Sequence, residues 1–303
     1  GRARSLAAAR GGLVMGELLI GTADWSYPDW KGVVYPRSVP EAFDPLRYLA
    51  AYLDLIEINS TFYRAPDPRH AERWAETVLD LERFRFTAKV AKEFTHTDPE
   101  AWSGQNVARF KEGIAPLIDA GKLAALVIQF PFYFDATPKR LEHLRRLKGA
   151  FDVAPLVLEV RHRSFLAPPV WKVLEELQLS FCNTDQPLSQ TSIEPGARVS
   201  GPIGYLRLHG RNREAWFRKG AGRDEKYDYL YDGGELKSFA SLVRELRQKT
   251  GQTFVVTNNH FLGKAPANAL ELKGLLEGLP VAVPETLLET YPRLKVLQER
   301  TTP

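Results

Sequence analysis

The sequence predicts a single α/β domain, a (β/α)8 or TIM-like barrel. Short segments rich in Val, Ile, Leu and Phe alternate with longer segments of helical period, a pattern typical of repeated βα units. Eight strand candidates spread over roughly 265 residues, which is the size of such a barrel. The segment after the first strand, 21–25, lacks the Gly-rich dinucleotide fingerprint, so an open doubly wound sheet is the weaker alternative.

The expected strands are short and apolar, and amphipathic helices are expected between them. One helix is predicted behind Pro168 and Pro169 and another around Leu236 to Leu246, each with an apolar face at helical spacing. Residues 186–202 are rich in Pro, Gly and Ser and have no helical period, so the sixth helix is expected to be missing or replaced by a loop. The expected strands cover residues 18–20, 53–58, 84–88, 124–130, 156–160, 179–182, 205–208 and 254–257.

The composition is that of one globular domain, expected over residues 16–300. Hydrophobic residues make up 44% and charged residues 26% of the 303, which excludes disorder, collagen and coiled coil as descriptions of the whole chain. Residues 1–15 are expected to be a disordered or non-native N-terminal extension, because Met15 is the only methionine and an apolar strand begins soon after it. No internal repeat or linker divides the chain.

The single cysteine, Cys182, excludes a disulfide within the chain, so a reducing cytoplasm is the expected compartment. No run approaches the roughly 18 to 20 apolar residues of a membrane span, so no membrane partner is expected. The net charge of +4 is too small to predict a nucleic-acid partner, and the location of the charges matters more. The sequence does not predict an oligomeric state.

Polar residues stand where nearly every expected strand ends. Charged groups at the ends of barrel strands must be paired or bound to a ligand, because an isolated buried charge costs several kcal/mol. They form either a closed set of salt bridges or the floor of a ligand site, and the second interpretation is favoured because barrel active sites lie at this face. These residues are Glu57, Asn59, Lys89, Gln129, Glu159, Arg161, Asp185, Arg207, His209, Asn258 and Asn259.

Three of these residues are candidate catalytic groups. Glu57 and Glu159 are acids within otherwise apolar strands, and His209 is a candidate general base on the same strand face as Arg207. The cations among the strand-end residues suit an anionic substrate such as a phosphate or a carboxylate. The side chains expected to bind substrate are Lys89, Arg161, Arg207, Arg211, Asn59, Gln129, Asp185, Asn259, Trp25 and Tyr27.

A divalent metal is a further candidate at the same strand ends. Glu57, Glu159, Asp185 and His209 offer oxygen ligands and one imidazole, a set that suits Mg, Mn or Zn. No local metal motif such as HExxH is present, and the neighbouring cations argue against a metal, so the cofactor is left open.

Two loops are expected to form walls of the site. Residues 22–43 are rich in aromatic side chains, among them Trp25 and Tyr27, which would pack a lid or stack on a ring. Residues 211–231 interleave basic residues such as Arg211 and Arg218 with aromatic residues such as Trp216, a mixture that can hold phosphates and stack bases. The alternative for this second loop is a mobile surface lid with solvated charges.

These motifs resemble those of the domain of unknown function 72 (YecE-like) family of TIM-barrel-like proteins. The resemblance implies the barrel and leaves the reaction open, since fold alone does not give function. The chain departs from the usual pattern at Ala23-Asp24, Val34, Phe132 and Phe165. The matching motifs are Gly21-Thr22 with Trp25, Tyr27 and Trp30, Tyr35-Pro36, 57–63, Lys89 with Thr95-His96, 129–131, 159–161, Asp185 with Pro187, 207–211, Asn258-Asn259 and Asn268-Ala269.

The leading functional hypothesis is an enzyme that hydrolyses a phosphoester in an anionic small molecule or a nucleic acid. Cations would neutralise charge on the phosphoryl oxygens while a carboxylate or His209 activates water. One alternative is a sugar or sugar-phosphate enzyme, either a glycoside hydrolase or an isomerase, in which the two carboxylates carry the chemistry. The other is a noncatalytic nucleic-acid-binding module that uses the loop 211–231.

Overall fold

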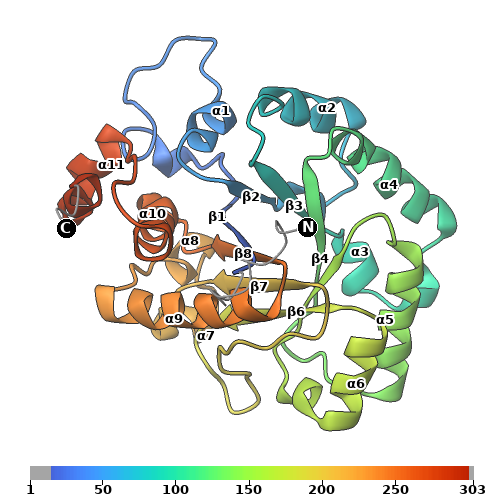
Figure 1. The fold of residues 1–303 in the computed structure, drawn as a ribbon. Helices are drawn as coiled ribbons and strands as arrows, with labels where there is room; N and C mark the ends of the chain where they lie inside the picture. The colour runs from blue at the N-terminus through green and yellow to red at the C-terminus, as the bar shows by residue number, and fades with distance from the viewer. Residues whose placement is uncertain (1–14, 300–303) are drawn as a thin grey trace, which may run out of the picture.

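The computed structural model describes residues 15–299 and contains a closed barrel of eight parallel strands (Figure 1). The strands pair in sequence order, and β8 closes the barrel by pairing with β1. The predicted (β/α)8 fold is therefore confirmed. The strands are β1 (Glu17–Ala23), β2 (Leu55–Ile58), β3 (Arg85–Lys89), β4 (Leu123–Gln129), β5 (Leu156–Glu159), β6 (Ser180–Asp185), β7 (Ile203–Leu208) and β8 (Gln252–Thr257).

Helices surround the strands on the outside of the barrel (Figure 1). Several of them begin at a side chain that accepts hydrogen bonds from free backbone N–H groups, as Ser103 does for α4 and Asp232 for α9. The helices are α1 (Pro45–Ala50), α2 (Pro68–Thr77), α3 (Lys92–Thr95), α4 (Gly104–Asp119), α5 (Pro138–Ala150), α6 (Pro168–Glu176), α7 (Arg213–Phe217), α8 (Arg223–Lys226), α9 (Gly233–Lys249), α10 (Lys264–Glu277) and α11 (Glu285–Thr290). Short 3-10 helices lie at Pro28–Trp30, Ser60–Phe62, Pro99–Ala101, Arg163–Leu166, Phe261–Gly263 and Pro292–Gln298.

The connection between β6 and β7 lacks a helix, as the sequence predicts. Residues 186–202, all of them described, form an irregular loop between these two parallel strands. The side chain of Asn183 holds this loop on β6. Its Nδ2 donates to the carbonyl of Arg198 at 2.9 Å, and its Oδ1 accepts from the N–H of Arg198 at 3.0 Å. A buried amide thus supplies the polar contacts that tie the loop to the sheet.

Strand β6 differs from its predicted extent. It continues to Asp185, whereas the prediction ended at Cys182 where the apolar residues stop. The added residues are buried although they are polar, because Asn183 bonds the following loop and Asp185 pairs with Arg211. The extension predicted over residues 1–15 lies outside the described residues, apart from Met15. Residues 15–299 also include no helix with the length and apolarity that a membrane crossing requires.

Side chains that point into the barrel fill it with a packed core, and those that point outward pack beneath the helices. Leu19, Val157 and Phe254 are among the inward-facing residues. A Cβ atom added to Gly21 would lie 1.6 Å from the carbonyl oxygen of Leu55, so only glycine permits the close approach of β1 and β2. The apolar filling ends at the carboxyl ends of the strands, where the candidate site begins.

Candidate functional site

The inward-facing positions become polar at the carboxyl ends of five strands. Because side chains alternate between the two faces of a strand, one inward position at the end of each strand projects into the same space. The structure therefore brings together residues that are up to 150 positions apart, as the sequence predicts. They are Glu57 of β2, Lys89 of β3, Gln129 of β4, Glu159 of β5 and Arg207 of β7.

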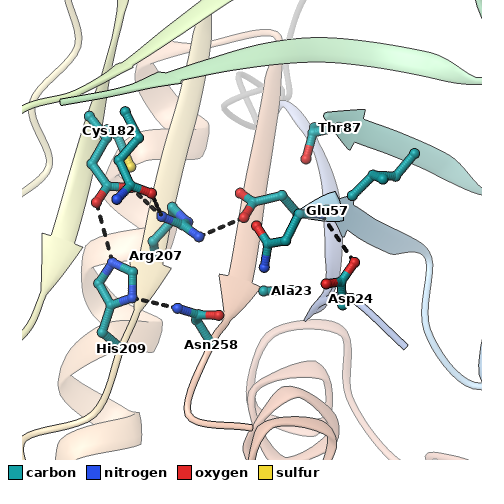
Figure 2. A network of polar contacts seen from close by, with 12 residues as sticks. Ala23, Asp24, Glu57, Thr87, Cys182, Arg207, His209 and Asn258 are labelled. Atoms are coloured by element: carbon teal, nitrogen blue, oxygen red, sulfur yellow. Dashed lines mark hydrogen bonds and ion pairs between the residues drawn. The ribbon is translucent and has the colours of Figure 1, made fainter. Parts of the chain in front are cut away.

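Arg207 lies between Glu57 and Glu159, and all three side chains are fully buried (Figure 2). Its Nη2 donates to Oε1 of Glu57 at 2.6 Å, and its Nη1 donates to Oε2 of Glu159. The other oxygen of Glu57 accepts from the hydroxyl of Tyr205 at 2.9 Å. Burial alone would raise the pKa of Glu159, but the charge of Arg207, the contact with His209 and the charge of Arg161 together outweigh burial and hold that pKa well below its usual range.

This geometry gives the two glutamates a clear structural role. Each neutralises part of the charge on a guanidinium that has no exposed surface, which is the salt-bridge alternative that the sequence left open. The catalytic roles of Glu57 and Glu159 and the substrate contact of Arg207 stay predictions, since no structural contact tests them.

His209 follows β7 and is buried beside the same network (Figure 2). Its Nδ1 lies 2.8 Å from Nδ2 of Asn258, and its Nε2 lies 3.4 Å from Oε1 of Glu159. Burial and the nearby charge of Arg207 lower the pKa of His209 to about 3, so the imidazole is neutral at physiological pH. A base of such low pKa accepts a proton poorly. The general-base role of His209 stays a prediction, and this geometry favours a hydrogen-bonding role.

Lys89 and Arg161 are two strand-end cations that retain free donors, and Nε of Arg207 also lacks a partner among the described residues. Within the part of the chain that the structure describes, Nζ of Lys89 forms neither a hydrogen bond nor an ion pair, and it lies 5.4 Å from the ring centroid of Phe62. Burial and the charge of Arg207 lower the pKa of Lys89 to about 8. Arg161 donates from Nη2 to Glu159 at 3.1 Å, while its buried Nε has no partner among residues 15–299. Both groups can therefore donate to a ligand.

A cavity of about 810 Å³ opens above these strand ends. Its floor includes Gln129, Arg161 and Gln186, and its walls include Trp216 and Lys226. None of the described lining residues is Asp or Glu. The side-chain oxygen Oε1 of Gln186 is buried without a hydrogen-bond partner in the described structure. The cavity thus offers cationic and amide groups between aromatic walls.

The loop 211–231 covers the network from above, as a lid would. It contains the two short helices α7 and α8, and the rings of Trp216 and Tyr227 lie 6.2 and 6.0 Å from the His209 ring. The guanidinium of Arg161 lies 5.8 Å from the centroid of the Trp216 ring. Gly220, between the two helices, has a φ of +84° that few other residues adopt. The covering loop explains why the network beneath it has almost no exposed surface.

The fold and the site can now be compared with known proteins. The family described as "Protein of unknown function DUF72" matches residues 19–290. The chain belongs to this family. A similar curated relative is the UPF0759 protein YunF of Bacillus subtilis (strain 168), which is 27% identical over 277 residues that cover 86% of this chain and 95% of that protein. The resemblance inferred from the motifs is thus confirmed, and the family description assigns no reaction.

Two solved structures of DUF72 proteins share the fold. The one from Thermotoga maritima MSB8 is 30% identical, with a TM-score of 0.73, and the match covers 86% of this chain and 99% of that one. The one from Enterococcus faecalis V583 is 26% identical, with a TM-score of 0.75, over 86% of this chain and 95% of that one. The barrel is therefore shared along nearly the whole length of these relatives.

Two residues predicted to bind substrate, Arg211 and Asp185, instead anchor the lid in this DUF72 chain. Nε and Nη2 of Arg211 donate to the Asp185 carboxylate at 2.8 to 3.0 Å, and Nη1 donates to Glu235 at 2.8 Å. Asp185 also accepts from the hydroxyl of Tyr231 at 2.6 Å. These contacts fix the start of the loop to β6 and α9, and the substrate roles of Arg211 and Asp185 stay predictions.

The aromatic residues predicted on the first loop are packed against the protein. Tyr27 is buried, stacks on the His260 ring at 4.4 Å and donates its hydroxyl to the carbonyl of Ala23. Trp25 packs edge-on against Trp74 at 5.5 Å. Of the two predicted roles for this loop, packing is the one that the contacts support.

The two asparagines predicted at the site differ in their surroundings. The Nδ2 group of Asn259 donates to the carbonyl of Tyr229 and to the side chain of Asn268, both at 2.8 Å, so it braces the lid. Asn59 uses its backbone N–H to donate to Asp24, and its side-chain oxygen is buried without a partner among the described residues. The side-chain oxygen of Asn259 also lacks a partner there, so an oxygen of each asparagine remains available to a ligand.

The four predicted metal ligands do not form a metal site. Glu57 and Glu159 are separated by Arg207, and Asp185 is held by Arg211. Across residues 15–299, no three side chains of His, Cys, Asp or Glu are placed to hold a metal ion. The physical reason is that the guanidinium of Arg207 occupies the position between the two carboxylates that a metal cation would need.

The sequence reasoning missed Asp24 and Gln186. Asp24 ends the inward turn after β1, has a φ of +56° and accepts from the N–H of Asn59 at 3.1 Å. Burial raises the pKa of Asp24 to about 6. Both are polar residues that directly follow a strand, Asp24 after β1 and Gln186 after β6, and that position is the signal by which the sequence marks them.

Proposed function

We propose that this DUF72 chain binds an anionic substrate in the cavity over the strand ends and hydrolyses a phosphoester there. The observation that supports it most is the composition of the cavity, whose charged lining residues are Arg161 and Lys226 without an accompanying acid. The buried ammonium of Lys89 adds a third positive charge close to Arg161. The same groups also bind carboxylates, so binding alone does not distinguish a carboxylate from a phosphoester. Turnover of defined substrates makes that distinction.

The free donors of Arg161 suit a phosphoryl group. A guanidinium donates two parallel hydrogen bonds to phosphate oxygens, and a lysine adds a point charge. In hydrolysis the oxygen of water forms a bond to phosphorus while the bond to the leaving oxygen breaks, and negative charge builds on the phosphoryl oxygens. Arg161 and Lys89 would stabilise that charge.

Two proton transfers complete this scheme. The attacking water passes its proton to a phosphoryl oxygen, because Glu159 is buried, is bound by Arg207 and Arg161 and has a pKa too low for an effective base. Lys89, whose pKa of about 8 lies near neutral pH, would donate a proton to the leaving oxygen. Aromatic walls at Trp216 and Tyr227 favour a substrate that carries a ring.

The test is turnover of bis(p-nitrophenyl) phosphate, p-nitrophenyl phosphate and a p-nitrophenyl glycoside, each with EDTA or with Mg, Mn or Zn. We expect release of nitrophenol from a phosphoester, with kcat/KM lowered by about 10²-fold or more in Arg161→Met. Arg145→Met, which removes an exposed arginine of α5, is the matched control and should turn over like the wild type. Turnover of the glycoside alone, or equal rates in wild type and Arg161→Met, would refute the proposal.

A further inference from the structure

The four aromatic side chains that are largely exposed within residues 15–299 all lie on loops that follow strands at the carboxyl end of the barrel. Tyr63, Phe132, Tyr133 and Phe217 are 66%, 68%, 58% and 52% exposed. Tyr63 lies between β2 and α2, Phe132 and Tyr133 lie between β4 and α5, and Phe217 ends α7 in the lid. Single exposed apolar residues are ordinary, but four aromatic rings around one opening indicate a binding surface.

Unpaired cations stand beside the first of these rings. Tyr63 borders a groove of about 1060 Å³ whose lining also includes Arg64, Lys92 and Arg109. In the described structure these three cations form no ion pair, and Nζ of Lys92 lies 5.7 Å from the centroid of the Tyr63 ring.

The same groove contains two acids, Asp67 and Glu93, fewer than its three cations. Asp67 is bound by Arg69 at 2.7 Å, and Glu93 accepts from the side chain of Asn106 at 2.7 Å. The groove therefore presents net positive charge next to an exposed ring. Such a surface is complementary to a polyanion.

The groove and the cavity over the strand ends belong to one curved surface. His96 and Thr97 line both the groove and a smaller cavity of about 290 Å³, which also includes Tyr133. The neighbouring Phe132 lines the large cavity that contains Arg161. The adjacent residues Phe132 and Tyr133 thus place the groove side and the Arg161 side of the barrel mouth next to each other.

We propose that this surface binds a single-stranded nucleic acid, which makes an oligonucleotide the substrate class of the hydrolase proposed above. Unpaired bases stack on Tyr63, Phe132 and Tyr133, while backbone phosphates lie against the unpaired cations of the groove. A duplex hides its base faces within its own stack, so exposed rings favour a single strand. The inference rests on the proposed function only for the step of cleavage, since the binding surface is defined by its own residues.

The test is fluorescence anisotropy of a labelled 20-nucleotide single strand, as DNA and as RNA, and of a duplex of equal length. We expect Kd for the single strands to rise about tenfold in the double variant Tyr63→Ser, Phe132→Ser. The reason is that stacking of each base on an aromatic ring contributes to the free energy of binding. The double variant Arg64→Gln, Lys92→Gln should weaken binding and lower its dependence on salt.

Matched controls remove exposed residues away from this surface. Leu79→Ser with Val296→Ser removes two exposed aliphatic side chains, and Arg145→Gln with Lys172→Gln removes two exposed cations. Both controls should bind like the wild type. Equal affinity in the rim variants and the controls would overturn the inference. Equal affinity for the duplex, or binding of anionic phosphatidylserine vesicles without binding of the oligonucleotides, would overturn it as well.

The two proposals fail separately. If the single strands do not bind but bis(p-nitrophenyl) phosphate is hydrolysed, the inference is wrong and the proposed function stands. If the single strands bind through the aromatic rim but no phosphoester is cleaved, the proposed function is wrong and the binding surface stands.

Discussion

At the scale of single residues, the charged groups at the strand ends divide into two sets. Arg207, Glu57 and Glu159 neutralise one another below the cavity, whereas Arg161 and Lys89 keep donors that a ligand can use. The buried carboxylates of the first set allow the cations of the second set to be buried nearby. Two buried carboxylates stabilise the positive charges around them, and without these carboxylates the cost of desolvating three neighbouring cations would oppose folding.

The buried network gives a prediction for stability. Arg207→Met leaves Glu57 and Glu159 buried without the cation that both of them share. The free energy of unfolding at pH 7 should therefore fall by about 3–5 kcal/mol. Urea unfolding at pH 7 and pH 4 measures it, and the loss should be smaller at pH 4, where the carboxylates of the variant protonate. Arg47→Met is the control, because Arg47 pairs with Asp80 on the surface and its removal should cost far less. Equal losses in the two variants would contradict the account.

Asp24 gives a second prediction, in which a carboxyl group opposes folding. Its pKa is about 6 in the folded state against 3.8 unfolded, so the folded state binds more protons between these values and stability falls as the pH rises through this window. Asp24→Asn keeps the shape and the acceptor for Asn59. It should be more stable than the wild type by about 1–2 kcal/mol at pH 7.5 and nearly equal to it at pH 4.

The same urea titrations of Asp80→Asn serve as the control for Asp24. The Asp80 carboxyl has its pKa lowered by Arg47, so its removal should not stabilise the protein at pH 7.5. A gain for Asp24→Asn that is the same at both pH values would show that relief of backbone strain, and not charge, is the cause.

From the sequence it was possible to predict which side chains lie at the same end of the barrel. It was not possible to predict which of them form ion pairs. Strand alternation was enough to place Glu57, Lys89 and Glu159 at one end of the barrel. It could not show that Arg207 separates the two glutamates or that Arg211 binds Asp185, because those pairs depend on rotamers and on strands that are distant in the sequence. For this reason it could not show that, among the described residues, the four candidate metal ligands are not gathered into one site.

At the scale of elements, apolar periodicity predicted all eight strands and the two amphipathic helices tested, α6 and α9. This periodicity did not predict the segments in which buried residues are polar. The end of β6 contains Asn183 and Asp185, whose partners Arg198 and Arg211 lie in later loops, so no local pattern marks that strand end. The short helices of the lid were missed for a similar reason, because the side chain of Asn212 caps α7 within a segment of high polarity.

At the scale of the whole molecule, the barrel places one large functional surface at the carboxyl ends of its strands. The connections after β2, β3, β4 and β7 supply the exposed rings and cations, β3 supplies Lys89, and the segment directly after β5 supplies Arg161. A closed barrel holds these groups in fixed positions while the loops remain free to differ between relatives. The proposed hydrolysis depends on an anion bound at Arg161 and Lys89, whereas the proposed binding of a single strand depends on the exposed rings and on the cations of the groove.

The most direct test of this account is the change in Tm that inorganic phosphate causes at constant ionic strength. A ligand that binds only the folded state raises Tm with its concentration, so the wild type should be stabilised. Lys89→Met and Arg161→Met should lose this increase, while Lys172→Met and Arg145→Met, at exposed cations of α6 and α5, should keep it. Without phosphate, Lys89→Met should be at least as stable as the wild type, because it removes a buried charge. Equal phosphate shifts in all five proteins, or no shift in the wild type, would contradict the central claim that the strand ends form an anion site.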